Sequence, residues 1–217
     1  MPADKRVVGV DEAGKGDFFG PLVVAGILCK ESEDNKLLPL GVRDSKLIAD
    51  GKILQISEQL RRLFPHFILT ITPEEYNTLY KQIKNLNKLL AGAHAHVIAR
   101  LVSDFGADKV ILDKFGKTDL VEKELAHKRI DIELLQVEHG ERYVPVAAAS
   151  ILARAGFITA MDEMSREAGM EIPKGASALV DEAARKFLKK YGDKTLSKLV
   201  KTHFKNFHRV LSPNMLG

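Results

Sequence analysis

VVGVDEAGKGDFFGPLVVAGILC, the stretch from Val7 to Cys29, decides the fold. An apolar run, residues 7–10, leads into Asp11 and Glu12 and a glycine-containing loop, and a second apolar run over residues 22–28 follows at once. Carboxylates at the end of a strand lose hydration energy unless a cation compensates them. Glycines beside them let the backbone come very close to a ligand. The stretch therefore predicts a hard metal ion and a substrate read by the backbone in one place.

The composition is that of an ordinary globular protein. The chain has 217 residues, of which 45% are hydrophobic and 29% are charged, enough for one substantial domain. Its apolar runs fall short of the roughly 20 residues that a membrane span needs, and the N-terminal MPADKR lacks the apolar core of a signal peptide. The single cysteine, Cys29, can form no internal disulfide and is expected to be a small buried side chain. We therefore expect a cytoplasmic protein with no membrane segment.

Positive charge is concentrated near the C-terminus, although the net charge is a mild +4. Between residues 185 and 209, nine basic side chains stand against one acid, Asp193. The nine are Arg185, Lys186, Lys189, Lys190, Lys194, Lys198, Lys201, Lys205 and Arg209. A solvated helix face is the ordinary explanation of such a run. Beside an acidic metal site, basic residues would instead neutralise the phosphates of a polyanionic substrate, and both interpretations are open at this point.

The periodicity of apolar residues predicts alternating strands and helices. Runs rich in β-branched residues and bounded by Gly or Pro predict strands over residues 6–11, 22–29, 66–72, 109–113 and 131–136. Helical spacing predicts helices over residues 50–64, 86–105, 118–128, 147–164, 178–190 and 195–207. This order indicates an α/β domain with one mixed sheet. We find no internal repeat, low-complexity tract or long linker.

Motifs along essentially the whole chain are similar to those of the type 2 ribonucleases H. The first is DEAGKGDFFGP, residues 11–21, whose DFFGP ending is nearest to ribonuclease HIII. The others, in chain order, are Asp44-Ser45-Lys46, Tyr76-Asn77, NLNKLLAGAHAHVI (85–98), Ile111-Leu112-Asp113, VAAASILAR (146–154), IPKGAS (172–177) and THFKN (202–206). The resemblance implies an α/β ribonuclease H-like fold, with a mixed five-stranded sheet flanked by helices. We expect a single catalytic domain over residues 1–217, in which about 175–217 form a C-terminal helical extension.

The same resemblance implies an endonuclease that hydrolyses the RNA strand of RNA–DNA hybrids, leaving 5′-phosphate and 3′-hydroxyl ends. Hydrolysis of a phosphodiester by two divalent cations needs carboxylates from several elements at one point. Oxygen ligands suit hard cations, so Mg²⁺ or Mn²⁺ is expected, with two ions in the substrate complex. The resemblance assigns catalysis and metal binding to Asp11, Glu12, Asp113 and Glu141. Glu138 is a rival of Glu141, and a surface turn, EHGER, is the ordinary alternative for both.

The loop Gly14-Lys15-Gly16 has two possible explanations. GVDEAGK, residues 9–15, fits the start of a phosphate-binding P-loop, but Gly16 stands where a Ser or Thr would hold magnesium. Two acids inside the cradle would also repel the phosphates, so we reject nucleotide binding. The resemblance implies that the loop backbone contacts the 2′-hydroxyl of the strand to be cut, which distinguishes RNA from DNA. Ribonucleases HII carry Arg at the middle position, whereas Lys15 offers a cation without bidentate geometry.

Four further residues are predicted to bind substrate by the resemblance. Ser45 and Lys46 belong to a polar trio that could instead form a turn and cap the following helix. Asn85 and Asn87 either cap the long helix over residues 86–105 or donate hydrogen bonds to the substrate. The resemblance favours the substrate role for all four.

Other polar residues in the motifs are expected to have structural roles. Ser150 is expected to form a packing or helix hydrogen bond, because no His and Asp pattern around it indicates a catalytic triad. His94 and His96 lie two apart on a predicted helix and face different directions, so packing or surface roles are expected instead of a shared metal. His203, in THFKN, is a candidate for a flexible acid that protonates the leaving group.

Three alternative functions stay open. Incision at single ribonucleotides embedded in DNA, as in ribonuclease HII, is the nearest. Phe18-Phe19, Lys15 and THFKN argue for type HIII, but members of that type usually carry a substrate-binding domain before the first motif, and here ten residues precede Asp11. The expected protein either lacks that domain or is truncated. The others are a non-catalytic nucleic-acid-binding module and, by fold analogy, a DNA nuclease. We expect a monomer whose partner is an RNA–DNA hybrid, not a membrane.

Overall fold

The computed structural model describes residues 4–42, 45–116 and 119–212. Asp44, in the predicted polar trio, and Thr118, the expected start of a helix, lie outside the described residues. The chain forms two compact units. Unit 1 consists of Met1–Ala13, Val23–Leu69 and Asn85–Gly156, and unit 2 consists of Gly14–Leu22, Thr70–Lys84 and Phe157–Gly217. A single domain over residues 1–217 stays a prediction.

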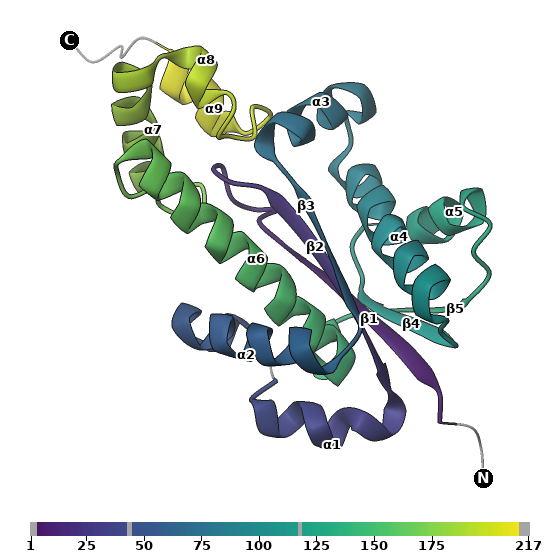
Figure 1. The fold of residues 1–217 in the computed structure, drawn as a ribbon. Coiled ribbons are helices and arrows are strands. Elements are labelled where there is room, and N and C mark those ends of the chain that lie inside the picture. Colours follow the sequence, from purple (N-terminus) through teal and green to yellow (C-terminus); the bar gives the residue numbers. More distant parts are fainter. Residues whose placement is uncertain (1–3, 43–44, 117–118, 213–217) are drawn as a thin grey trace. The chain divides into compact units, whose positions relative to one another are not determined.

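A five-stranded sheet in the order β3-β2-β1-β4-β5 organises the chain (Figure 1). The strands are β1 (Arg6–Ala13), β2 (Leu22–Lys30), β3 (His66–Ile71), β4 (Lys109–Asp113) and β5 (Glu133–Val137). β1 pairs antiparallel with β2 and parallel with β4, and β4 pairs parallel with β5. The prediction of a mixed five-stranded sheet is therefore confirmed. β1 is the middle strand of the sheet, and its residues 7–10 are buried. Asp11 and Glu12 directly follow this buried stretch.

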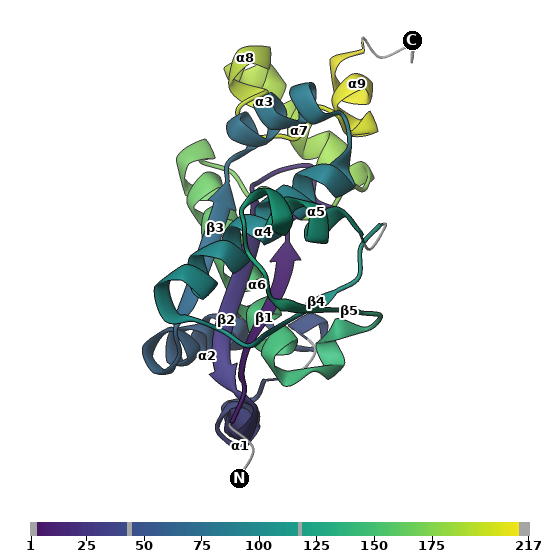
Figure 2. The same ribbon diagram turned by 90° about the vertical axis from the view of Figure 1, so that its right-hand side faces the viewer.

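Helices of unit 1 cover both faces of the sheet (Figures 1 and 2). α2 (Asp50–Leu63) and the first half of α6 (Val144–Ala168) lie on one face, and α4 (Leu86–Phe105) and α5 (Asp119–His127) lie on the other. Two glycines permit this close packing. A Cβ atom on Gly9 would lie 2.2 Å from the Pro145 carbonyl at the start of α6, and one on Gly26 would lie 2.7 Å from Val97 and Leu101 of α4.

α6 is the most apolar helix of the fold. By length and composition it could cross a membrane, but 67% of its most apolar window is buried inside the protein. A helix that is apolar all round is expected in a protein core as well as in a membrane. Its observed bounds extend beyond the predicted residues 147–164 at both ends. The buried position is that of a core helix.

Unit 2 contains short helices around the loop of residues 14–22. They are α3 (Pro73–Ile83), α7 (Ala178–Tyr191), α8 (Asp193–Leu196) and α9 (Lys205–Leu211). The sequence analysis did not predict α3, although its start carries a capping box in which Thr72 and Glu75 satisfy each other's backbone amides. In unit 1, α1 (Asp34–Leu37) and 3₁₀ turns at residues 31–33, 38–40, 45–47 and 140–142 complete the regular structure of the described residues.

One predicted helix is wrong. Residues 195–207 were expected to form a single amphipathic helix, but the chain is helical only in α8 and α9 and is extended around Val200. There Val200 pairs with Phe19 in an isolated β-bridge. The neighbouring Lys201 is fully buried, and its amide donates to the Phe18 carbonyl at 2.8 Å. Tertiary hydrogen bonding to the loop therefore replaces the helical hydrogen bonds that the spacing predicts.

Candidate active site

Asp11 lies near the end of β1, and Asp113 is the last residue of β4, its parallel neighbour in the sheet. Val10 of β1 is aligned with Leu112 of β4, so extending the register by one residue places Asp11 beside Asp113. Strands in a sheet lie about 4.8 Å apart, and aligned residues of parallel strands direct their side chains to the same face. The register therefore brings these two predicted catalytic residues together on one face of the sheet.

Asp11 has an environment that disfavours its negative charge. Burial, together with the neighbouring charge of Glu12, raises the pKa of this carboxyl to about 7. Hydrogen bonds from the Glu12 amide, 2.8 Å from Oδ1, and from Ser150 oppose the rise in pKa. A desolvated carboxyl next to a second carboxylate is relieved by a bound cation. The donor set at this position therefore fits a hard divalent metal ion.

Glu12 faces the opposite side of the sheet from Asp11. Successive strand residues alternate in direction, and the Glu12 carboxylate lies against His94 of α4, with 2.9 Å between Oε2 and Nε2. His94 is fully buried and its ring lies 4.7 Å from that of Phe115. The expectation of a packing role for His94 omitted this polar contact. The periodicity of the helix gave no signal of it, because the partner lies 82 residues away in the chain.

Asp113 is tied to the turn that carries the two rival glutamates. The Gly140 amide donates to Asp113 Oδ1 at 2.9 Å, and Glu141 follows in the same turn with 30% of its side chain exposed. Glu138 is 78% exposed and lies 3.4 Å from the Lys114 ammonium. The backbone tie thus places Glu141 directly after a residue bonded to Asp113, whereas Glu138 points into solvent. Across residues 4–42, 45–116 and 119–212, no three metal-binding side chains are already gathered as a ligand cluster.

The two glycines of the Gly14-Lys15-Gly16 loop differ in their surroundings. Gly14 has a φ of +84°, and a Cβ atom there would lie 2.2 Å from the Pro21 carbonyl oxygen. A Cβ atom on Gly16 would have nothing within 4 Å. Gly14 is therefore required by the loop itself, whereas Gly16 leaves open space beside the backbone. Lys15 is exposed.

Lys201 forms hydrogen bonds to the residues that follow Gly16, from Asp17 to Pro21. Its buried ammonium donates to the carbonyl oxygens of Asp17, Gly20 and Pro21 at 2.9, 2.6 and 3.3 Å. Three acceptors match the three protons of an ammonium group. Burial nevertheless lowers the pKa of Lys201 to about 7, since the charge has lost its hydration. The Gly175 amide adds a bond of 2.6 Å to Asp17 Oδ1, so the loop is held from several directions within unit 2.

The predicted substrate residues Ser45 and Lys46 have different environments. Ser45 is buried, and its hydroxyl lies 2.8 Å from that of Ser150. Arg154 of α6 donates to the Ser45 carbonyl and, at 2.7 Å, to Asp50 Oδ1. Lys46 is exposed in the 3₁₀ turn at 45–47. Ser45 is therefore a packed structural residue in this state, and Lys46 is the more accessible of the two.

Asn85 and Asn87 lie at the start of α4. Asn85 is the N-cap, and its Oδ1 accepts from the Lys88 amide at 3.0 Å. Both asparagines are exposed, and they line a hollow of about 330 Å³ together with Lys88, Asp119, Leu120 and Lys123. Asn85 therefore caps α4, which was one of the two roles considered for it, the other being substrate binding.

His203 is part of an aromatic stack. Its ring lies 4.1 Å from the ring of Tyr80 and 5.4 Å from that of Tyr76. Burial, with a smaller effect from Lys201, lowers the pKa of His203. Stacking on two tyrosines favours a packing role for the ring, and the role of His203 as a flexible acid stays a prediction.

Comparison with known proteins gives one consistent family. The family described as Ribonuclease HII matches residues 8–207. Ribonuclease HIII of Protochlamydia amoebophila is 41% identical over 204 residues, which cover 94% of this chain and 68% of that protein. Ribonuclease HIII of Chlamydia caviae is 42% identical over 206 residues, 94% of this chain and 69% of that protein. The solved structure of Bst-RNase HIII in complex with Mn²⁺ superposes with a TM-score of 0.89 at 33% identity, covering 96% of this chain and 70% of that one.

Proposed function

The chain belongs to the ribonuclease HII family and is a ribonuclease H, and from this membership we propose that it cleaves the RNA strand of RNA–DNA hybrids internally. The products would carry 5′-phosphate and 3′-hydroxyl ends. The observation that supports the proposal is the register of β1 and β4, which pairs Val10 with Leu112, the residues that directly precede Asp11 and Asp113. The 41–42% identity to proteins named Ribonuclease HIII supports hybrid cleavage over incision at single ribonucleotides.

Divalent metal binding is the second part of the proposal. The predicted ligands of Mg²⁺ or Mn²⁺ are Asp11, Glu12, Asp113 and Glu141, and the raised pKa of Asp11 supports a cation at this place. In this structure the Glu12 carboxylate faces His94, on the opposite side of the sheet from Asp11, so its side chain would have to turn to reach the same ion. The similar Bst-RNase HIII was solved in complex with Mn²⁺. When bound, a pair of such ions activates a water molecule and stabilises the leaving oxygen. His94 would keep the Glu12 carboxylate in one orientation, and Gly140 would do so for Asp113.

Selection of RNA is proposed for the Gly14–Gly16 loop. The open space beside Gly16 supports a close approach of a ribose to the backbone, and a 2′-hydroxyl can both donate to and accept from backbone groups. The hydrogen bonds of Lys201 keep the following residues of the loop in place. A preformed loop loses little entropy on binding, which favours discrimination by geometry.

Cleavage of two matched labelled duplexes tests the proposal. One is a full RNA–DNA hybrid, and the other is DNA with a single embedded ribonucleotide, each incubated with Mg²⁺ and then Mn²⁺. We expect cutting at several positions in the hybrid, and no cutting by the Asp11→Asn variant. Cutting confined to the lone ribonucleotide would transfer the protein to ribonuclease HII-type specificity. Binding of both duplexes with no cutting under either metal would indicate a non-catalytic module.

A further inference from the structure

Six of the nine basic side chains near the C-terminus fall into two groups in the structure. One group has internal partners. Arg209 pairs with Asp181 at 2.8 Å, Lys186 pairs with Glu182 at 2.8 Å, and Lys201 is buried against backbone carbonyls. Lys190 lies 4.8 Å from the centre of the Tyr191 ring. These four side chains have structural roles, so the run is not simply a solvated helix face.

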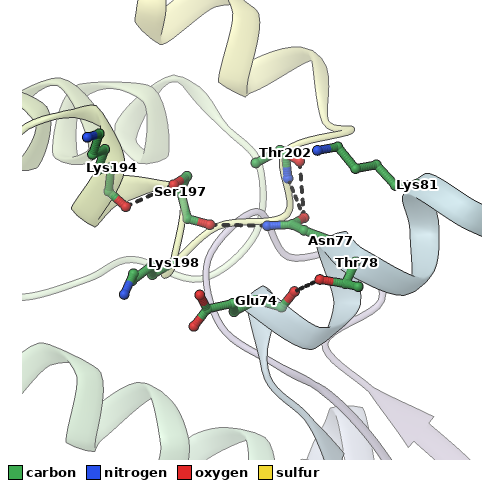
Figure 3. Close-up of a pocket in the computed structure, with 8 residues that line it drawn as sticks. All are labelled: Glu74, Asn77, Thr78, Lys81, Lys194, Ser197, Lys198 and Thr202. Carbon is green, nitrogen blue, oxygen red and sulfur yellow. Dashed lines mark hydrogen bonds between the residues drawn. The ribbon is translucent and has the colours of Figure 1, made fainter.

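Lys194 and Lys198 form the second group, and they meet a third lysine from a distant part of the chain. Together with Lys81 of α3 they line a hollow of about 400 Å³ within unit 2. Its other lining residues are Glu74, Asn77, Thr78, Ser197 and Thr202. Figure 3 shows Lys81 on one side of Asn77, with Lys194 and Lys198 on the other. Among the described residues, no carboxylate forms an ion pair with any of these three ammonium groups.

The floor of the hollow is rigid because Asn77 joins its two walls (Figure 3). The Asn77 amide nitrogen donates to the carbonyl oxygens of Ser197 and Val200 at 3.1 and 2.8 Å. Its oxygen accepts from the Thr202 amide at 2.9 Å and from the Thr202 hydroxyl at 3.2 Å. All the hydrogen-bonding capacity of this side chain is used in the link. Asn77 therefore fixes α3 against residues 197–202 and sets the spacing of the lysines.

The charge of the lining favours an anion. Three lysines and one acid, Glu74, leave two positive charges in excess around the hollow. A hollow of this volume has room for a hydrated phosphate group beside the three ammonium groups. Lysines act on phosphate as point charges and need no bidentate geometry. The arrangement differs from the candidate active site, where the gathered side chains are acidic.

We propose that this hollow binds a phosphate of the nucleic-acid backbone and that Lys81, Lys194 and Lys198 form a substrate-binding site separate from the catalytic carboxylates. The proposal rests on the proposed function, because a nucleic-acid substrate supplies the phosphate. Contact with the backbone carries no sequence information. Its contribution is affinity and registration of the duplex, and it should be sensitive to salt.

The test measures binding without cleavage. Fluorescence anisotropy gives the Kd for a labelled RNA–DNA hybrid in EDTA, for the wild type and for the triple variant Lys81→Gln, Lys194→Gln, Lys198→Gln. We expect the Kd of the triple variant to rise about tenfold, and the slope of log Kd against log salt to fall by about one. Glu74→Gln removes the one acid and is expected to lower the Kd by about threefold.

A matched variant separates a local site from general electrostatics. Lys186→Gln, Lys189→Gln, Lys190→Gln removes the same charge from α7, and its Kd is expected to stay within about twofold of wild type. An equal loss of affinity in both triple variants would overturn the local site, as would an unchanged Kd in the first. With metal added, cleavage by the wild type tests the proposed function on its own. A wild-type protein that binds the hybrid but does not cut it would contradict the proposed function, and the comparison of Kd values would still test the phosphate site.

Discussion

His94 Nε2 lies 2.9 Å from Glu12 Oε2, and the two side chains are 0% and 6% exposed. Among the described residues, the other ring nitrogen, Nδ1, is buried with no hydrogen-bond partner. Placing the proton on Nε2 lets it donate to the carboxylate and leaves Nδ1 as an unpaired acceptor, which costs less than an unpaired N–H. A histidine on one helix thereby orients an acid on the central strand from the face opposite Asp11.

Replacing His94 should harm both stability and activity. His94→Leu leaves a buried carboxylate without its donor, so we expect a loss of about 3 kcal/mol in the free energy of unfolding and a lower kcat. His94→Gln keeps a donor and should recover part of both. Urea denaturation and single-turnover cleavage measure the two effects. His96→Leu, on the exposed side of the same helix, is the control, and equal losses in both variants would contradict a specific role for the His94–Glu12 contact.

Metal binding should depend on Asp11. In Asp11→Asn, cleavage is expected to fall at least about a hundredfold, and the rise in Tm that Mn²⁺ gives the wild type should disappear. In EDTA the variant should be at least as stable as the wild type, because a neutral amide avoids the burial penalty that raises the pKa of Asp11. A variant that keeps the Mn²⁺-dependent rise in Tm would show that Asp11 is not a metal ligand.

The fourth carboxylate can be identified by a pair of substitutions. Glu141→Gln should lower cleavage at least about a hundredfold. Glu138→Gln should change it by less than a few-fold, because this exposed side chain makes only a surface ion pair with Lys114, worth about 1 kcal/mol or less. Initial rates on the hybrid at saturating Mg²⁺ decide between them. The reverse order of effects would assign the role to Glu138.

Regular elements with strong local signals were predictable from the sequence. The helix over residues 86–105 and the strand over residues 109–113 have the predicted bounds. Their apolar spacing is consistent over the whole element, and the helix is bounded by an asparagine cap, Asn85, and by Gly106. The positions of Asp11 and Asp113 in their strands were predictable for the same reason, since each follows an apolar run, whereas their catalytic role is a prediction from the resemblance.

Features that depend on distant partners were not predictable. Residues 195–207 have helical spacing, but the three carbonyl acceptors of Lys201 lie about 180 residues earlier in the chain. The His94–Glu12 contact likewise joins α4 to β1. Ser45 was predicted to bind substrate or to form a turn, and its contact with Ser150 of α6 was not predicted. In each case the deciding hydrogen bonds join residues far apart in the chain, and no local sequence pattern records them.

The buried Lys201 should make stability depend on pH. Its pKa in the folded protein is about 7, against 10.5 for an ordinary lysine. Between these values the unfolded chain binds more protons than the folded protein, so this residue makes the free energy of unfolding rise with pH from about 7 to 10.5. Lys201→Met leaves three carbonyl oxygens without their donor, so it should lower the free energy of unfolding by about 3 kcal/mol at neutral pH.

The stability difference between wild type and Lys201→Met should therefore grow between pH 7 and pH 9.5, because methionine does not titrate. Chemical denaturation at both values measures it. Thr195→Ala, at an exposed position of α8, serves as the control and should show a constant difference. A difference that is the same at both pH values for Lys201→Met would mean that burial does not lower its pKa in the folded protein.

Two glycine substitutions distinguish the framework of the loop from its contact with substrate. Gly14→Ala forces a Cβ atom to 2.2 Å from the Pro21 oxygen at a φ of +84°, so it should lower both the Tm and cleavage. Gly16→Ala meets nothing within 4 Å and should leave the Tm within about 1 °C of wild type.

If the backbone at Gly16 approaches the ribose, the added methyl group should still raise the KM for the hybrid. Thermal unfolding and steady-state cleavage of the hybrid give both values for each variant. Unchanged cleavage by Gly16→Ala would mean that ribose is recognised elsewhere, because the open space beside this backbone would then have no part in binding.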